Sequence, residues 1–342
     1  DGVDSILGGA GNDKLYGDNI ADDLSSVIDG TNDDTLIGGA GDDELYGGKG
    51  DDTLQGGAND DILRGGDDTD TVDYRSATGS VTVDLAIDGV AQAIGGGEGS
   101  DTFYDVENVL GSSYADTFKS SYTSNNRFEG GIADSDGGDT VDYSSLVVDD
   151  TSVDKVVATL SGATVTGSSG STATNVTDTF IDIENITGSA GNDTITGNGS
   201  NNTIKGLAGD DILEGGTGND YLDGGTHTSG DSVNFSTATE GVNVDLGIDG
   251  TAQVVSANQG TDTFVSIENV IGSAYADNFK GNNSVSNTFN GGTTNLSDST
   301  NPSNETSNDE NDTVNYEDST SKIVADLTSN SVVIGGSVTD NL

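Results

Sequence analysis

A nine-residue unit rich in glycine and aspartate recurs along the chain and restricts its fold more than any other feature. The pattern is Gly-Gly-x-Gly-x-Asp-x-U-x, where U is a large apolar residue, and three copies follow one another in residues 38–64. The end of each unit resembles a short strand that turns one apolar side chain inward between two outward ones. One inward residue per unit cannot form a core, so the units must stack. Stacking predicts a parallel β-solenoid in which each strand pairs with the turns before and after it.

The repeat occupies two stretches of the chain. Regular copies are 8–16, 38–46, 47–55, 56–64 and 215–223, and looser copies are 29–37, 65–73, 188–196 and 206–214. The unit 197–205 departs from the pattern because Asn202 stands where aspartate is expected. Acids at the sixth position are Asp4, Asp13, Asp34, Asp43, Asp52, Asp61, Asp70, Asp193, Asp211 and Asp220. Stacked turns would arrange these carboxylates in rows.

The charge of the chain indicates that such rows need a cation. Acidic residues number 60 against 10 basic ones, which gives a formal net charge of −50. Hydrophobic residues make up 31%, against the usual ~45–50%. Carboxylates ~4 Å apart repel by ~1 kcal/mol in water and by ~4 kcal/mol where they are partly shielded. A compact form of this chain therefore requires bound positive charge.

Calcium is the cation that fits these residues best. Ca²⁺ takes about six to eight oxygen ligands at ~2.3–2.6 Å, whereas Mg²⁺ demands a tight octahedron and keeps its waters. The chain has no cysteine and one histidine, His227, so zinc and other metals with nitrogen or sulfur ligands are poor candidates. The repeat thus predicts several bound Ca²⁺ ions.

The same features exclude several function classes. Strong negative charge disfavours binding to nucleic acid, and no apolar run is long enough for membrane insertion. The sequence contains no nucleophile elbow, zinc-protease helix motif or phosphate-binding loop. We therefore predict that this chain is not an enzyme.

A longer cassette interrupts the nonapeptides. "DTVDY" at 70–74 recurs at 139–143, as "DSVNF" at 231–235 and as "DTVNY" at 312–316. The predicted segments are a first nonapeptide block over 1–73 with an insertion at about 18–28, cassettes over 74–138 and 139–187, a second nonapeptide block over 188–230, a third cassette over 231–311 and the start of a fourth over 312–342. Because the chain begins and ends inside a repeat, we interpret it as a fragment of a longer protein.

The role of the cassettes is open between two interpretations. They contain alternating strand-like pieces such as "VTVDL" from Val81 and "VNVDL" from Val242. The first interpretation is that the cassettes continue or cap the solenoid, with aromatic residues closing its ends (Tyr74, Phe103 and Phe264). The second is that the glutamates of the "DTF" segments are additional calcium ligands or ligand-binding groups (Glu107, Glu184 and Glu268).

Residues 38–64 resemble the nonapeptide repeats of RTX proteins, which bacteria secrete through the type I pathway. The resemblance implies an all-β fold in which right-handed parallel β-roll blocks, with a pair of nonapeptides per turn, are interleaved here with the β-rich cassettes. It also implies Ca²⁺ held between successive loops by the position-six aspartates and by main-chain carbonyls of positions one and three. Those positions are Gly8, Ala10, Gly38, Ala40, Gly47, Lys49, Gly56, Ala58, Gly188, Ala190, Gly206, Ala208, Gly215 and Thr217.

The expected function is that of a non-catalytic calcium-binding module in a large secreted or cell-surface bacterial adhesin. The type I secretion machinery of the parent protein would export it unfolded, and it would fold on meeting Ca²⁺ outside, since extracellular calcium modules bind at ~10⁻⁴–10⁻³ M. The alternatives are a carbohydrate- or ice-binding module, or the RTX part of a secreted enzyme or toxin. The candidate glycan contacts are Tyr104, Tyr114, Tyr122 and Tyr275, and a glycan or surface ligand elsewhere in the parent protein is a further expected partner.

Overall fold

The computed structural model describes residues 3–18, 32–121, 123–131, 137–146, 155–160, 165–167, 176–282, 286–291, 313–315, 323–326, 331–334 and 338–341. The chain divides into two compact units. Unit 1 comprises Asp1–Tyr143 and Gly162–Asn185, and unit 2 comprises Ser144–Ser161 and Ile186–Leu342. Among the residues described, no helix has the length and apolar character that crossing a membrane requires.

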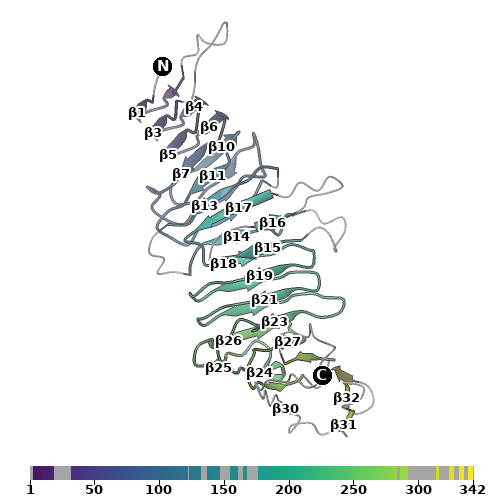
Figure 1. Cartoon of the computed structure of the whole chain (residues 1–342). Coiled ribbons are helices and arrows are strands. Elements are labelled where there is room, and N and C mark those ends of the chain that lie inside the picture. The colour runs from purple at the N-terminus through teal and green to yellow at the C-terminus, as the bar shows by residue number, and fades with distance from the viewer. Residues whose placement is uncertain are drawn as a thin grey trace. The chain divides into compact units, whose positions relative to one another are not determined.

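Unit 1 is a parallel β-solenoid in which strands of successive turns stack on one another (Figure 1). The first sheet pairs, in this order, β1 (Ser5–Ala10), β3 (Thr35–Ala40), β5 (Thr53–Ala58), β7 (Thr71–Asp73), β11 (Asn108–Leu110), β13 (Arg127–Glu129) and β17 (Val176–Ile181). The second pairs β2 (Lys14–Tyr16), β4 (Glu44–Lys49), β6 (Ile62–Asp67) and β10 (Ser100–Tyr104). A further parallel group contains β8 (Thr82–Asp84), β12 (Thr117–Lys119) and β14 (Thr140–Asp142).

Unit 2 repeats this architecture. One parallel sheet contains β15 (Val157–Thr159), β19 (Thr194–Thr196), β21 (Ile212–Glu214), β23 (Ser232–Asn234), β27 (Asn269–Ile271) and β29 (Thr288–Asn290). Other parallel groups are β18 (Asn185–Thr187), β20 (Thr203–Lys205), β22 (Tyr221–Asp223) and β26 (Gly260–Val265), and β24 (Asn243–Asp245), β28 (Asn278–Lys280) and β30 (Thr313–Asn315). A short 3₁₀ helix, η2 (Leu246–Ile248), follows β24, and β31 (Ile323–Asp326), β32 (Ser331–Ile334) and β33 (Val338–Asn341) pair in antiparallel fashion. The predicted all-β parallel solenoid is confirmed.

The core is the predicted column of apolar residues. In unit 1, Leu36, Leu54 and Val72 are in register on successive strands, and each is 0% exposed. Leu45 and Leu63 are aligned in the same way in the second sheet. Full burial of such a side chain contributes ~1.5–3 kcal/mol, so the column supplies the apolar stabilisation that a single turn lacks.

Each cassette inserts a hairpin and then rejoins the solenoid. In unit 1, β9 (Gln92–Ala93) runs antiparallel to β10, which in turn pairs in parallel with β6. In unit 2, β25 (Gln253–Ser256) and β26 form the same arrangement, and β26 pairs with β22. In the second cassette, β16 (Val165–Gly167) is antiparallel to β17. The cassettes therefore continue the solenoid.

The aromatic residues that were expected to close the ends lie inside the units. Tyr74 and Phe103 are 1% and 3% exposed and contact each other edge to face. Phe264 is 3% exposed and makes the same kind of contact with Phe235. Strands continue beyond all of them, so the expectation that these rings close the ends of the solenoid was wrong.

Candidate metal centres

The position-six aspartates form hydrogen-bonded ladders along each unit. One carboxylate oxygen of each aspartate accepts a hydrogen bond from the backbone N–H of the ladder residue one turn earlier. In unit 1 the ladders run through Asp4, Asp34, Asp52 and Asp70, and through Asp13, Asp43 and Asp61, with distances of 2.6–2.8 Å. In unit 2 they run through Asp193, Asp211 and Asp231, and through Asn202, Asp220 and Asp262, at 2.7–3.0 Å. Nearly all are buried, whereas Asp4 is exposed at the first turn and Asp13 is partly buried.

The second carboxylate oxygen of most of these aspartates faces the interior without a donor. Within the described part of the chain, no hydrogen-bond partner reaches the buried Oδ2 atoms of Asp13, Asp34, Asp43, Asp52, Asp61, Asp70, Asp211, Asp220 and Asp231. Leaving a buried polar atom unsatisfied costs ~1–3 kcal/mol, and more for a charged group. Buried charges in proteins are normally paired or bound to a metal. The repetition of this defect at equivalent positions therefore indicates cation sites.

The first glycine of the unit leaves room in front of this oxygen. A Cβ atom on Gly47 would lie 2.2 Å from Asp52 Oδ2 and 2.6 Å from the carbonyl oxygen of Gly65. A Cβ on Gly38 would lie 2.4 Å from Asp43 Oδ2 and 2.6 Å from the position-one carbonyl of the next turn. A carboxylate and a carbonyl oxygen thus converge on one small space beside Gly38 and beside Gly47. This donor set fits a hard cation such as Ca²⁺.

The carbonyl oxygen of the third position is engaged in hydrogen bonds between neighbouring turns. The carbonyl of Ala40 accepts a hydrogen bond from Gly11 N–H at 2.7 Å, and that of Ala58 accepts one from Gly41 N–H at 3.0 Å. Both alanines end strands that pair in register. The structure therefore brings positions one and six together and uses position three in the strand ladder, and ligation by position three stays a prediction.

A serine at the second position changes the surroundings of the carboxylate. Ser189 donates its backbone N–H to Asp193 Oδ2 at 2.6 Å and its hydroxyl to Oδ1 at 2.9 Å. The same pair of bonds joins Ser112 to Asp116 (2.6 and 2.8 Å) and Ser273 to Asp277 (2.8 and 2.8 Å). Where the structure describes the second residue of a unit with an unsatisfied Oδ2, that residue instead has a positive φ, for example +116° at Gly39 and +82° at Leu207. The carboxylates beside serine are thus satisfied by the protein itself.

Burial shifts the pKa values of the ladder carboxyls upward. Desolvation raises the pKa of Asp52 to about 7, and that of Asp61 and of Asp211 to about 8, with neighbouring acids adding to the shift. The pKa of Asp193 is raised only to about 6, because Ser189 and Val156 donate hydrogen bonds to its charged form. Hydrogen bonds from the protein thus offset part of the desolvation that raises the pKa of Asp193.

The cassette glutamates extend the ladders. Glu107 Oε2 accepts a hydrogen bond from Asp70 N–H at 2.9 Å, and Glu184 and Glu268 accept from Asp139 and Asp231 at 3.0 Å. Each glutamate therefore takes the place that an aspartate has in a nonapeptide turn. A direct role in metal binding stays a prediction.

The nonapeptide pattern does not predict the ladder acids of the cassettes. Asp101 accepts a hydrogen bond from Asp61 N–H at 3.1 Å through Oδ1 and from the Tyr74 hydroxyl at 2.6 Å through Oδ2. Tyr143 donates to Asp178 in the same way at 2.6 Å. The recurrent "DTF" was the available signal, but nothing in its spacing connects it to a tyrosine many residues earlier.

Glu98 is a buried acid outside the ladders and supports a stability prediction. It is 6% exposed, no hydrogen-bond partner for Oε2 lies among the residues described, and burial raises its pKa to about 7. The aligned residue of the third cassette is Gln259, also 6% exposed. At pH 8 the charged carboxylate destabilises the folded state, so Glu98→Gln is expected to raise the free energy of unfolding by about 1–3 kcal/mol.

This gain should vanish near pH 4, where the carboxyl is protonated in both states. Urea unfolding in calcium buffer at the two pH values would measure it, and Gln259→Glu should show the reverse effect. A loss of stability in Glu98→Gln at pH 8 would contradict the prediction and would indicate that this carboxylate holds a cation.

Comparison with known proteins agrees with this geometry. A family model of the RTX calcium-binding nonapeptide repeat (4 copies) matches residues 1–24, 26–54, 46–76, 180–211 and 196–226. No curated protein matches the chain. The matched ranges contain the ladder aspartates Asp13, Asp34, Asp43, Asp52, Asp61, Asp70, Asp211 and Asp220, whereas Asp231 lies outside them.

Proposed function

We infer that this chain, which carries RTX calcium-binding nonapeptide repeats, is a structural module whose β-solenoid forms when Ca²⁺ binds. The observation that carries the proposal is the set of buried Oδ2 atoms that lack donors and face the position-one glycines. Bound Ca²⁺ would supply the positive charge that these carboxylates need. Without it, their mutual repulsion and desolvation oppose the compact state.

The proposed ligands follow from the same geometry. They are the carboxylates of Asp13, Asp34, Asp43, Asp52, Asp61, Asp70, Asp211 and Asp220, together with main-chain carbonyls that face several of them, such as Gly56 O beside Asp43 and Gly65 O beside Asp52. The carbonyls of position three remain proposed additional ligands. The Asp193 unit is a weaker candidate because Ser189 already satisfies its carboxylate. Asp4 would complete the set at the exposed first turn.

The proposed setting is a large secreted or cell-surface adhesin of a bacterium, in which the module is non-catalytic. RTX repeats are typical of secreted proteins. A net charge of −50 favours an extended chain where Ca²⁺ is scarce, which suits export by a type I secretion system. Millimolar Ca²⁺ outside would then neutralise the ladders and allow the turns to stack.

Neither carbohydrate nor ice binding gains support from the exposed side chains. The guanidinium of Arg64 lies 3.6 Å from the ring centroid of Tyr104 and covers a face that a sugar would need. Tyr114 and Tyr275 are exposed but lie in different units, and Tyr122 lies outside the described residues. The aligned threonines of β3, β5 and β7 are followed in register by Asn108 and Arg127, so they form no long regular row.

A calcium titration followed by circular dichroism tests the proposal. We expect little β signal in EDTA at pH 8 and a cooperative gain at ~10⁻⁴–10⁻³ M Ca²⁺. Asp52→Asn removes a buried ladder charge and should raise the midpoint about tenfold, or about 1.4 kcal/mol. The matched change Asp51→Asn removes an exposed charge from the adjacent residue and should shift the midpoint less than about twofold. A full β signal in EDTA at pH 8 would refute coupled folding.

A further inference from the structure

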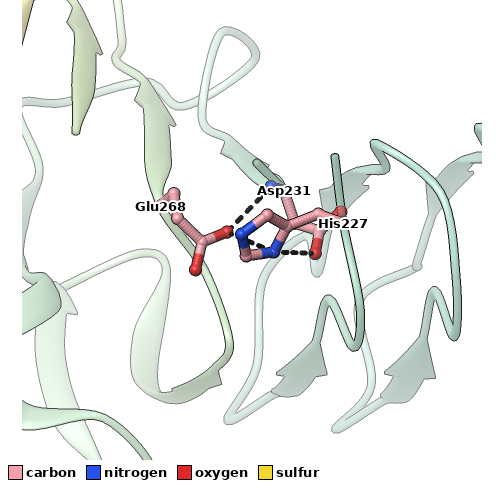
Figure 2. A group of neighbouring side chains, drawn as sticks. All are labelled: His227, Asp231 and Glu268. Atoms are coloured by element: carbon pink, nitrogen blue, oxygen red, sulfur yellow. Dashed lines mark hydrogen bonds and ion pairs between the residues drawn. The ribbon is translucent and has the colours of Figure 1, made fainter. Parts of the chain in front are cut away.

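A histidine lies against the end of a ladder in unit 2 (Figure 2). His227 Nδ1 is 3.1 Å from Glu268 Oε2 and 3.4 Å from Asp231 Oδ2. Glu268 Oε2 also accepts a hydrogen bond from Asp231 N–H at 3.0 Å. Asp231 directly precedes β23 and Glu268 directly precedes β27, and the pairing of these strands brings the carboxylates together. One nitrogen and two oxygen atoms thus meet at one corner.

The corner contains a buried carboxylate oxygen that accepts no hydrogen bond from the described residues. The side chain of Asp231 is 0% exposed, and its Oδ2 has no hydrogen-bond partner in the described part of the chain. The contact between this oxygen and the imidazole is an ion pair when the imidazole is protonated, and with neutral imidazole it brings two potential ligand atoms close together without a hydrogen bond. Glu268 is 11% exposed in its side chain and His227 is 33% exposed, so the corner is open to solvent on the histidine side.

The loop that carries His227 is held in place. The backbone N–H groups of Thr228, Ser229 and Gly230 all donate to Asp210 Oδ1, at 2.8, 2.6 and 3.2 Å. This turn fixes the chain between the histidine and Asp231. The imidazole is therefore presented to the two carboxylates before any ligand binds.

We propose that His227, Asp231 and Glu268 form a binding site for a divalent transition-metal ion of the zinc class, chemically distinct from the calcium sites. Zinc ligands lie ~2.0–2.2 Å from the metal in a tetrahedron, which places neighbouring ligand atoms ~3.3–3.6 Å apart. The observed separations of 3.1 and 3.4 Å are close to this spacing, and the three ligand atoms all lie within 4.8 Å of one another. Imidazole nitrogen favours such metals over Ca²⁺, which prefers oxygen ligands. A water molecule would complete the coordination on the open side.

The equivalent corner of unit 1 shows what the histidine adds. There Glu107 accepts from Asp70 N–H at 2.9 Å, as Glu268 accepts from Asp231. The residue at the fourth position of that turn is Asp68, where unit 2 has His227. The turn of unit 2 is also longer, with three residues between His227 and Asp231 against one between Asp68 and Asp70, so the nitrogen ligand belongs to the longer turn of unit 2.

Titration with Zn²⁺ in the presence of saturating Ca²⁺ tests this inference. We expect the full chain to bind one equivalent of Zn²⁺ with a micromolar dissociation constant, measured by calorimetry, and Co²⁺ to give visible absorption bands of a site with nitrogen and oxygen ligands. His227→Gln and Glu268→Gln should each weaken Zn²⁺ binding at least about tenfold. Asp88→Asn, which removes an exposed charge from unit 1, should not change it.

Circular dichroism in Ca²⁺ must show that each variant folds, so that a lost site is distinguished from a lost fold. Wild-type affinity for Zn²⁺ in His227→Gln would overturn the assignment. Displacement of Zn²⁺ by millimolar Ca²⁺ would also overturn it, because the corner would then be an additional calcium site. Neither result depends on whether Ca²⁺ drives the folding of the repeats.

Discussion

Replacing Gly39 by alanine is expected to destabilise unit 1 by about 3–5 kcal/mol, which is the largest effect expected of any single substitution in the nonapeptide turns. Gly39 has φ +116°, a conformation that L-residues adopt only with strain of ~1–3 kcal/mol. A Cβ atom there would also lie 2.1 Å from the carbonyl oxygen of Gly9 in the adjacent strand. Main-chain atoms cannot move away as a flexible side chain would, so overpacking adds a further ~1–3 kcal/mol.

Gly9 supplies the matched control. Its φ is +113°, close to that of Gly39, but a Cβ atom at this position has no neighbour within 4 Å. Gly9→Ala should therefore cost only the conformational strain of ~1–3 kcal/mol. Urea unfolding of both variants in calcium buffer measures the difference. Equal losses would show that the close approach of successive turns does not limit the second position.

Acid is expected to substitute for calcium in holding the ladders together. Burial raises the pKa of Asp70 to about 7, of Asp61 to about 8 and of Asp220 to about 6, whereas an unfolded aspartate titrates near ~3.9. A raised folded-state pKa contributes stability that is full below the unfolded value and is lost as the pH rises through about 6–8. In EDTA the free energy of unfolding should therefore be several kcal/mol higher at pH 5 than at pH 8, since each group contributes ~1.4 kcal/mol per unit of pKa shift. The β signal in circular dichroism should accordingly be stronger at pH 5.

The affinity for calcium should instead increase with pH, because Ca²⁺ binds the ionised carboxylates. The midpoint of a calcium titration is expected to fall at least about tenfold between pH 5.5 and pH 8, and binding at pH 7 should release protons. Calorimetry in two buffers with different ionisation enthalpies measures that release. Asp51→Asn should release as many protons as the wild type, whereas Asp52→Asn should release fewer. Calcium binding without proton release at pH 7 would contradict the assigned pKa shifts.

The nonapeptide turns were predictable because their spacing determines their structure. Leu45 and Leu63 had to point inward, and Asp43 and Asp61 had to fall in one row, once the units were stacked. The effect of serine at the second position was not foreseen. Ser189 is close to Asp193 in sequence, but whether its N–H turns toward the carboxylate depends on a backbone angle that the repeat pattern does not specify.

The cassettes were less predictable because their contacts connect distant residues. Tyr74 reaches Asp101 across 27 positions, and the Glu107 carboxylate reaches the backbone of Asp70 across 37. Repeated letters indicated that these residues recur together. They did not indicate that a hairpin lies between them or that the solenoid continues on its far side.

The turns with a serine at the second position differ from the other turns in how much they depend on bound metal. Ser112, Ser189 and Ser273 donate hydrogen bonds to the aspartate carboxylates of their own turns. The turns of Asp116, Asp193 and Asp277 therefore depend least on a metal. In a stacked array each turn is stabilised mainly by its immediate neighbours. These turns are therefore natural nuclei from which ordered structure spreads as the ion concentration rises, and the last points at which it persists when the ions are withdrawn.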